Sequence, residues 1–207
     1  TMSLKSGALT FGAPEVKLSS FAMAQLGRRL GVPVRSTNGG QITAANSADG
    51  QAMQDSTSSM WASMLSGANQ VWHAAGWLEG GLTMSYEKFV LDLDHCGMML
   101  RMIQGLKVND EELARDSYRE SGPGDNFFST SHTMEHYSTA NYQSDLIEAG
   151  PYETWLENGS QTAEQRATSK WKEMVNAYEA PPIDPGVDEA LKDFIHQRKS
   201  GVPDAWY

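Results

Sequence analysis

Short apolar stretches alternate with longer amphipathic ones through the first part of the chain, and this alternation limits the possible folds more than any other feature. Three stretches bounded by Gly or Pro are strand candidates, at residues 4–11, 32–36 and 68–75, and residues 126–132 are a fourth. Amphipathic segments of helical length separate the first three. Because a crossover helix normally joins parallel neighbours, the alternation predicts an α/β fold with parallel strands. Three or four strands are too few to close an eight-stranded barrel.

Helical periodicity and capping residues define the helices between and after these strands. The clearest helix is predicted over residues 86–104, and another over residues 14–30, between the start signal Pro14 and the stop signal Gly31. In each, apolar side chains form one stripe, typical of a helix that packs on a core. The two stripes are Tyr86, Phe89, Val90, Leu93, Gly97, Leu100 and Ile103, and Val16, Leu18, Phe21, Ala22, Leu26 and Leu30. Further helices are predicted over residues 51–66, 110–120, 163–178 and 187–199.

The composition excludes several classes of function. The net charge of −10 repels phosphates, so no nucleic-acid partner is expected. Cys96 is the one cysteine, so no intrachain disulfide can form, and with 11 methionines the composition fits a reducing cytoplasm. Cys96 lies within a predicted helix and is interpreted as a packing residue rather than a nucleophile. No run of about 18 apolar residues occurs, so no membrane span is expected.

Several motifs, in order along the chain, carry a resemblance to a known family. The most specific is the run from His73 to Thr83, HAAGWLEGGLT, continued by Ser85–Lys88 and Asp92. The others are Ser6–Ala8 with Phe11–Glu15, Gly31–Arg35 with Asp49–Ala52, Gly122–Gly124 with His132 and Thr133, and Tyr152–Trp155 with Gly159, Arg166 and Ala167. With these motifs the chain resembles the trimethylamine methyltransferase family over nearly all of its 207 residues.

The resemblance implies a fold and a division of the chain. Family members form a (β/α)8 TIM-type barrel and are about twice as long as this chain. The expected fold is therefore a partial (β/α)8 barrel. Residues 1–140 are expected to be the C-terminal half of the barrel, and residues 141–207 a helical C-terminal extension packed on its outside.

The resemblance also implies an activity. Family enzymes move a methyl group from a methylated amine to the Co(I) of a separate corrinoid protein. The expected partners are thus a cognate corrinoid protein and a small methylated amine, and no cofactor is expected to be bound by this chain itself. Some members carry pyrrolysine, in a region that corresponds to the loop Ser36–Asp49 or just after it. None is present in this sequence, which points to a quaternary amine such as a betaine. Two half-barrels could cover each other's open sheet edges, so a homo-oligomer is expected.

Candidate substrate-binding side chains follow the third predicted strand, because TIM-barrel active sites lie at the C-terminal ends of strands. His73 could donate to a substrate carboxylate, Trp77 could stack on a trimethylammonium group, and Glu79 could balance its charge. The structural alternatives are that Trp77 plugs the barrel rim and that Glu79 caps the next helix. Gln51 and His132 are further candidates. The structural alternative for Gln51 is that it only starts its helix, and for His132 that its ring is hydrogen-bonded to the backbone. No catalytic residue is assigned.

Two other functions compete with methyl transfer. The run from His132 to His136 fits the H-x-x-E-H pattern of zinc peptidases, with Glu135 as the base. Its flanks show no helical stripe and Gly122–Gly124 lies close upstream, so zinc hydrolysis is the less favoured hypothesis and no metal site is expected. The other hypothesis is non-enzymatic: an incomplete half-barrel that dimerises or needs its N-terminal half.

Overall fold

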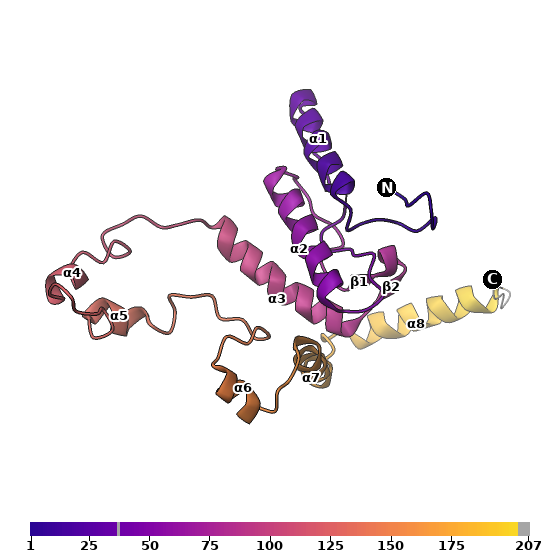
Figure 1. Cartoon of the computed structure of the whole chain (residues 1–207). Coiled ribbons are helices and arrows are strands. Elements are labelled where there is room, and N and C mark those ends of the chain that lie inside the picture. Colours follow the sequence, from indigo (N-terminus) through magenta and orange to yellow (C-terminus); the bar gives the residue numbers. More distant parts are fainter. Residues whose placement is uncertain (37, 203–207) are drawn as a thin grey trace. The chain divides into compact units, whose positions relative to one another are not determined.

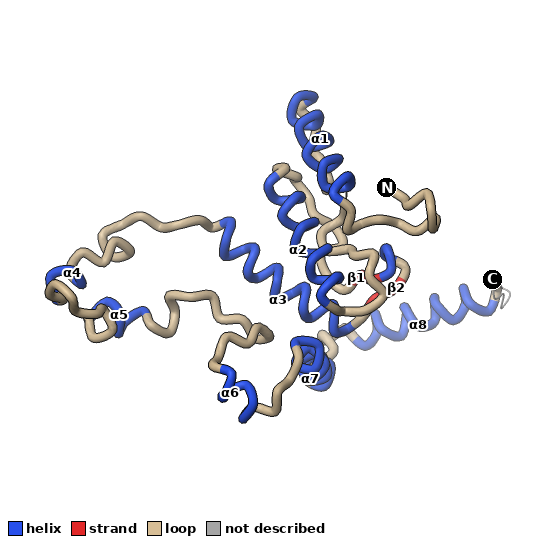
Figure 2. The backbone as a smooth tube through the Cα atoms, in the orientation of Figure 1, coloured by secondary structure: helices blue, strands red, loops and turns tan. Residues whose placement is uncertain are grey.

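The computed structural model describes residues 1–36 and 38–202, and in them the protein is mostly helical (Figure 1). The helices are α1 (Pro14–Leu30), α2 (Gly50–Leu65), α3 (Tyr86–Ile103), α4 (Ser117–Glu120), α5 (Ser131–His136), α6 (Tyr152–Glu157), α7 (Ala163–Asn176) and α8 (Pro185–Ser200). A 3-10 helix, η1 (Glu79–Gly81), joins the strands β1 (Trp77–Leu78) and β2 (Thr83–Met84). This antiparallel pair is the only sheet in the described residues, which contain no barrel (Figure 2).

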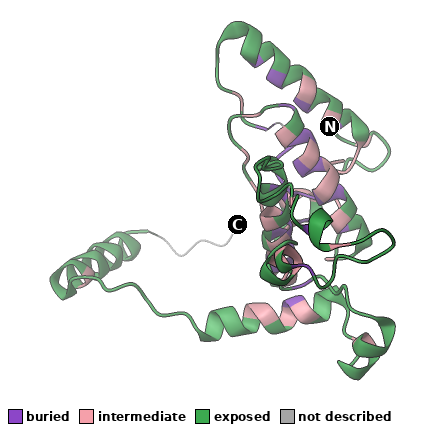
Figure 3. Ribbon diagram, turned by 90° about the vertical axis from the view of Figure 1, so that its left-hand side faces the viewer, coloured by how far each residue is buried: buried purple, intermediate pink, exposed green. Residues whose placement is uncertain are grey.

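The chain divides into two compact units, residues 1–172 and the residues from 173 onward. Buried residues of the first unit gather on α1, α2 and α3 and in the loop 38–45, and α2 packs against both α1 and α3 (Figure 3). In the second unit α8 has no buried residue. The predicted division between residues 140 and 141 stays a prediction. None of the helices in the described part of the chain is both long and apolar enough to cross a membrane.

The long helices follow the sequence prediction closely because their ends carry strong capping signals. Pro14 lies in the first turn of α1, and Gly31 ends it in the left-handed conformation, at φ 68°. The Asp49 side chain accepts a hydrogen bond from the Ala52 amide at the start of α2, and the Ser85 side chain accepts one from the Lys88 amide at the start of α3. The predictions of α1, α2, α3, α7 and α8 are confirmed to within about two residues at each end.

The predicted strand at residues 4–11 is wrong. Gly7 adopts φ 73° and turns the chain back on itself, so that an isolated antiparallel bridge joins Met2 to Leu9. The Ser3 amide donates to the Ala8 carbonyl oxygen at 2.9 Å within this turn. A glycine with positive φ ends an extended segment.

The predicted strands at residues 32–36 and 68–75 are present only as a short parallel pairing. Arg35 and Gln70 form an isolated parallel bridge, and the Ser36 amide donates to the Gln70 carbonyl oxygen at 2.8 Å. The direction of pairing is therefore as predicted, with α2 as the crossover, but the length is not. Pro33 has no amide hydrogen to extend the ladder, and His73 at φ 53° breaks the second segment.

The segment from residue 105 to 140 departs most from the prediction. Residues 126–132 form no strand, because Thr130 accepts from the Thr133 amide and starts α5 instead. The helix predicted over residues 110–120 is reduced to α4, since Ala114 adopts φ 47° and interrupts it.

The predicted apolar stripes of α1 and α3 face solvent for the most part, so the expected packing face is wrong. Exposed members are Leu18, Leu26 and Leu30 in α1, and Tyr86, Leu93, Leu100 and Ile103 in α3. The buried residues of α3 are Lys88, Val90, Leu91, Asp92, His95 and Met99, of which only Val90 belongs to the predicted stripe. This face of α3 meets buried backbone and amide groups of residues 38–45, which need hydrogen-bond partners that an apolar stripe cannot provide.

Candidate functional site

The loops that follow the two paired segments lie against each other. The Gln41 backbone amide donates to the His73 carbonyl oxygen at 3.0 Å. Further along, the Glu79 amide donates to the Ala45 carbonyl oxygen and the Gly80 amide to that of Thr43, each at 2.8 Å. The loop of residues 38–45 is thus bonded to the segment 73–85, and both follow the ends of the parallel pair.

Two of the sequence-predicted side chains meet in the second loop. The ring centroids of His73 and Trp77 are 5.2 Å apart, with the rings inclined at 83°. Trp72 lies edge-on to His73 at 6.3 Å, and the Arg35 guanidinium sits 4.9 Å from the Trp72 ring centroid. His73 and Trp77 are both half-buried, so their rings form a partly sheltered corner. An indole face in such a corner can contact a cation.

Glu79 and Gln51 lie in more open positions. Glu79 starts η1 with φ 52°, and its exposed carboxylate accepts a hydrogen bond from the Thr83 hydroxyl at 2.7 Å. It therefore orders its own loop, two residues from Trp77. Gln51 is exposed in the first turn of α2, two residues after the capping residue Asp49.

His132 lies in a separate local cluster with His136, one turn along α5. The ring centroids are 4.4 Å apart, and His136 Nε2 lies 3.4 Å from Glu111 Oε1. Both histidines line a cavity of about 420 Å³ with Lys107 and other residues of that segment. The H-x-x-E-H run is therefore helical, unlike its expected context, but Glu135 is exposed. Within residues 1–36 and 38–202, no group of three or more acidic, His or Cys side chains is arranged to hold a metal ion.

A buried ion pair on α3 is hydrogen-bonded to both loops. Lys88 and Asp92 are one helical turn apart and both completely buried. The Lys88 ammonium donates to Asp92 Oδ2, to the Ser56 hydroxyl at 2.8 Å and to the Gln41 carbonyl oxygen at 3.1 Å. Asp92 Oδ2 also accepts from the Gly76 amide at 2.9 Å. The pair thus contacts α2, the loop 38–45 and the turn before Trp77.

The Gln41 side chain is the second connection between the loops. Its Nε2 donates to the carbonyl oxygens of Ala74 at 2.6 Å and Asp92 at 2.9 Å. These acceptors fix the amide orientation, so Oε1 must accept from His95 Nδ1, which lies 2.5 Å away. His95 Nδ1 therefore carries the proton. Cys96 Sγ accepts from the same Nε2 at 3.1 Å, and its interpretation as a packing residue stays a prediction.

Burial shifts the ionisation of this network. Burial raises the pKa of Asp92 to about 6, and the neighbouring Lys88 charge opposes the rise. Burial likewise lowers the pKa of Lys88 against the opposing effect of Asp92, and it lowers the pKa of His95. Three acceptors around Lys88 favour its ammonium form, and the lowered pKa of His95 favours a neutral ring.

Small polar residues hold the loop 38–45 against the helices. Asn38 Oδ1 accepts from the hydroxyls of Ser20 on α1 and Ser63 on α2, at 3.0 and 3.1 Å. The Thr43 hydroxyl donates to Asp55 Oδ2 at 2.7 Å. Residues of this size allow the loop to pass close to α2, which explains its composition.

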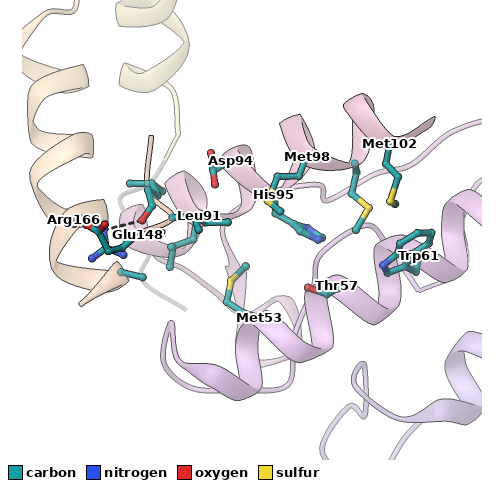
Figure 4. A pocket seen from close by; sticks show the side chains of 14 residues that line it. Met53, Thr57, Trp61, Leu91, Asp94, His95, Met98, Met102, Glu148 and Arg166 are labelled. Atoms are coloured by element: carbon teal, nitrogen blue, oxygen red, sulfur yellow. Dashed lines mark hydrogen bonds between the residues drawn. The ribbon is translucent and has the colours of Figure 1, made fainter. Parts of the chain in front are cut away.

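A cavity of about 610 Å³ lies beside this network, lined by α2, α3, residues 146–148 and the start of α7 (Figure 4). Its walls are mainly apolar and rich in methionine, with Met53 from α2 and Met98 and Met102 from α3. The His95 side chain extends from α3 toward α2 among these residues (Figure 4). None of the five sequence-predicted site residues is among those that line this cavity.

Sequence reasoning missed Lys88, Asp92 and Gln41. The spacing of Lys88 and Asp92 is that of an ordinary surface ion pair, so residue type gives no signal of burial. Two signals were available: both residues belong to the motif that continues the run from His73 to Thr83, and both fall between the apolar residues of the predicted stripe. The structure brings His73 and Trp77 together, with Glu79 close in the chain, but it joins neither Gln51 nor His132 to them through any contact of the described residues.

Comparison with known proteins relates the whole chain to one family. The family model described as "Trimethylamine methyltransferase (MTTB)" matches residues 1–203. A glycine betaine methyltransferase of Desulfitobacterium hafniense is 36% identical over 199 residues, which cover 96% of this chain and 41% of that protein. Trimethylamine methyltransferase MttB2 of Methanosarcina mazei is 33% identical over 195 residues, covering 93% and 38%. A trimethylamine methyltransferase of D. hafniense is 28% identical over 196 residues, covering 95% and 39%. The chain spans about two fifths of the length of these relatives.

Proposed function

This chain belongs to the trimethylamine methyltransferase family, and on that premise we propose that it forms part of a protein that moves a methyl group from a methylated amine to the Co(I) of a corrinoid protein. The proposed amine is quaternary, such as a betaine. A cognate corrinoid protein is the proposed partner, and homo-oligomerisation is part of the same hypothesis. The activity is proposed for a longer protein, because the chain covers about two fifths of its curated relatives.

Two features favour a quaternary amine over trimethylamine. The glycine betaine methyltransferase is 36% identical to this chain, against 33% and 28% for two of the trimethylamine methyltransferases. The sequence also contains no pyrrolysine. A quaternary nitrogen leaves as a neutral amine, keeping the electron pair of the broken N–C bond, so the protein need not form a covalent intermediate. Its task is to hold the cation and aim one methyl group.

The observation that carries this proposal is the corner formed by the rings of His73 and Trp77, 5.2 Å apart at the end of the second paired segment. A trimethylammonium group against the Trp77 face would be stabilised by about 0.5–2 kcal/mol. His73 would donate to the carboxylate of a betaine from the adjacent wall. When bound, the partner's corrinoid would supply the nucleophile that accepts the methyl group.

Glu79, Gln51 and His132 are separate hypotheses within the proposal. The Glu79 carboxylate is oriented by the Thr83 hydroxyl at 2.7 Å and would balance the charge of the amine. Gln51 and His132 are tested only by substitution, since the described contacts do not connect them to the ring pair. A loss of amine affinity on replacing either one by Ala would add it to the site.

For the fold, we propose that residues 1–140 form part of a TIM-type barrel and that residues 141–207 form a helical extension. The parallel bridge between Arg35 and Gln70, with α2 as the crossover, supports one repeat of such a barrel. The exposed apolar stripes of α1 and α3 would then pack against further parts of the barrel.

A methyl-transfer assay tests the proposed function. The natural full-length product and the 207-residue chain are each incubated with a Co(I) corrinoid protein and with glycine betaine, proline betaine, carnitine or trimethylamine. We expect the corrinoid spectrum to change with a betaine and the full-length product, and no turnover by the chain alone. Turnover with trimethylamine only would contradict the substrate class.

The exposed stripes also favour the alternative that the chain is an incomplete, non-catalytic half-barrel. Turnover of a betaine by the isolated chain would refute this alternative. Sedimentation of the chain at several concentrations measures whether it dimerises. Zinc hydrolysis has no supporting geometry among the described residues, so it stays less favoured than methyl transfer. If the protein bound one zinc ion and lost it when His132 and His136 were replaced, zinc hydrolysis would become the favoured function.

A further inference from the structure

Among the hydrogen bonds of the described residues, the loop 38–45 and the turn 73–77 are joined directly only through Gln41, whose backbone amide donates to the His73 carbonyl oxygen and whose side chain donates to that of Ala74. Each is irregular backbone, and the parallel pairing that precedes them is one bridge long. Besides these contacts, the buried face of α3 holds both segments, through Lys88 at the Gln41 carbonyl oxygen and Asp92 at the Gly76 amide. Asp92 accepts from the Gly76 amide in the turn between His73 and Trp77, so the pair contacts the backbone of the corner and not its rings.

Lys88 fixes the loop 38–45 to α3. An ammonium group has three N–H donors, and here they go to Asp92 on its own helix, to Ser56 on α2 and to the Gln41 carbonyl oxygen in the loop. Every donor is therefore used, and each partner belongs to a different element. A shift of the loop 38–45 would leave a buried donor without an acceptor, which is strongly unfavourable.

Asp92 fixes the turn 73–77 to α3. Its Oδ2 accepts from the Gly76 amide, directly before Trp77 and three residues after His73. Gly76 has φ 88°, and a Cβ built there would lie 2.9 Å from Met84 Cε and 3.3 Å from Phe89 Cβ. The turn therefore has little freedom to move toward α3, and the carboxylate prevents it from moving away.

We propose that Lys88 and Asp92 are positioning residues that set the place of the His73–Trp77 corner relative to the loop 38–45, with the Gln41 side chain as their connector. They touch no substrate. The pair does this through one acceptor and one donor of the backbone, the Gln41 carbonyl oxygen and the Gly76 amide. This inference rests on the proposed function for the role of the corner, but the geometry that it predicts can be measured without a substrate.

A purely structural ion pair would behave differently on replacement. Exchanging a buried ion pair for apolar residues of similar volume is often neutral for stability. The double variant K88M/D92L would then keep the fold, yet it offers nothing to the Gln41 carbonyl oxygen or the Gly76 amide. A positioning role predicts a displaced corner in a folded protein, whereas a structural role predicts no local change.

Backbone amide hydrogen exchange, followed by NMR on the 207-residue chain, tests this proposal. In K88M/D92L we expect the Gly76 amide to exchange at least about tenfold faster, with amides of α1 unchanged as internal references. The matched control D188L/K192M removes the exposed pair of α8 and should leave Gly76 unchanged. Unchanged exchange at Gly76 in a folded double variant overturns the proposal.

A second variant covers the case in which the double variant does not fold. D92N keeps the volume and an acceptor for Gly76 but removes the charge, so Gly76 exchange should rise by about threefold or more, since charge-assisted bonds are stronger. No rise in D92N overturns the proposal as well.

Calorimetric titration with glycine betaine, on the natural full-length product, separates this inference from the proposed function. If wild type binds and K88M/D92L binds about tenfold or more weakly, the corner is both a site and positioned by the pair. Binding by wild type with equal affinity in the double variant overturns the positioning role. An absence of binding by wild type counts against the proposed function and leaves the exchange result to decide the positioning.

Discussion

Two lysine–aspartate pairs of this chain have the same helical spacing and opposite surroundings. Lys88 and Asp92 on α3 are both 0% exposed, whereas Lys192 and Asp188 on α8 are 72% and 41% exposed. Helix rules favour the α8 pair, because its acid precedes its base. In α3, however, the pair also bonds to the loop 38–45, to α2 and to Gly76. Spacing therefore predicts that a pair forms, while burial decides what the pair does.

The largest expected effect is that of K88M. It leaves the Asp92 carboxylate buried without its counter-charge, which is expected to lower the free energy of unfolding by about 3–5 kcal/mol. The matched change K192M removes the exposed pair and should lower it by no more than about 0.5 kcal/mol. Urea unfolding followed by tryptophan fluorescence measures both. Equal stability of the two variants would remove the distinction between the pairs.

The pH dependence of stability sharpens the same comparison. The folded-state pKa of Asp92 is raised to about 6 from an ordinary 3.8, so the folded protein binds the proton more tightly. The stability that this provides is full below about pH 3.8 and is lost as the pH rises through about 6.

Relative to D92N, the unfolding free energy of wild type should therefore fall by on the order of 2 kcal/mol between about pH 4 and pH 7. Urea unfolding at a series of pH values measures the difference. D188N controls for the loss of one carboxylate from the chain. A difference that is constant over this range would contradict the shift.

A glycine substitution tests how tightly the first unit is packed. In a helix Gly→Ala normally stabilises by about 1 kcal/mol. At Gly27 of α1, however, the new Cβ would lie 2.0 Å from Val34 Cγ2, so G27A should destabilise by about 1–3 kcal/mol. G50A in α2 meets nothing within 4 Å and should be neutral or stabilising. Thermal unfolding of both variants checks the sign, and a stabilised G27A would show that α1 is not held against Val34.

The smallest effect is expected in α8. Asp184 caps this helix by accepting from the amides of Gly186 and Val187, so D184A should weaken it locally by about 1 kcal/mol. Because α8 has no buried residue, the unfolding of residues 1–172 should not change. Amide exchange at Val187, compared with amides of α2, measures this. Destabilisation of α2 by D184A would show that the two units are coupled.

The same contrast explains what the sequence could predict. Helix ends are set by local capping residues such as Pro14, Asp49 and Ser85, so α1, α2 and α3 are placed correctly. Strands depend on partners distant in the sequence, and of four candidates only the pairing of Arg35 with Gln70 persists. The buried face of α3 includes Lys88, Asp92 and His95 because of the loop that it contacts, and nothing in the helix sequence indicates that loop.

The candidate site follows the same rule. His73 and Trp77 are recognisable from their motif and lie together. Lys88 and Asp92 belong to the same motif, but their role becomes visible only when burial is known, as does that of Gln41, since their residue types are ordinary for a helix surface and a polar loop. Amine contact by His73, Trp77, Glu79, Gln51 and His132 stays a prediction until affinity is measured.

Calorimetric titration of glycine betaine into the natural full-length product tests the central claim most directly. Wild type should bind, W77F should keep most of the affinity because an aromatic face is retained, and W77A should lose about tenfold or more. W72A is the matched control, since the Trp72 ring is already in contact with the Arg35 guanidinium, 4.9 Å from its centroid. Equal affinity in wild type and W77A would contradict a quaternary-amine site at the His73–Trp77 corner.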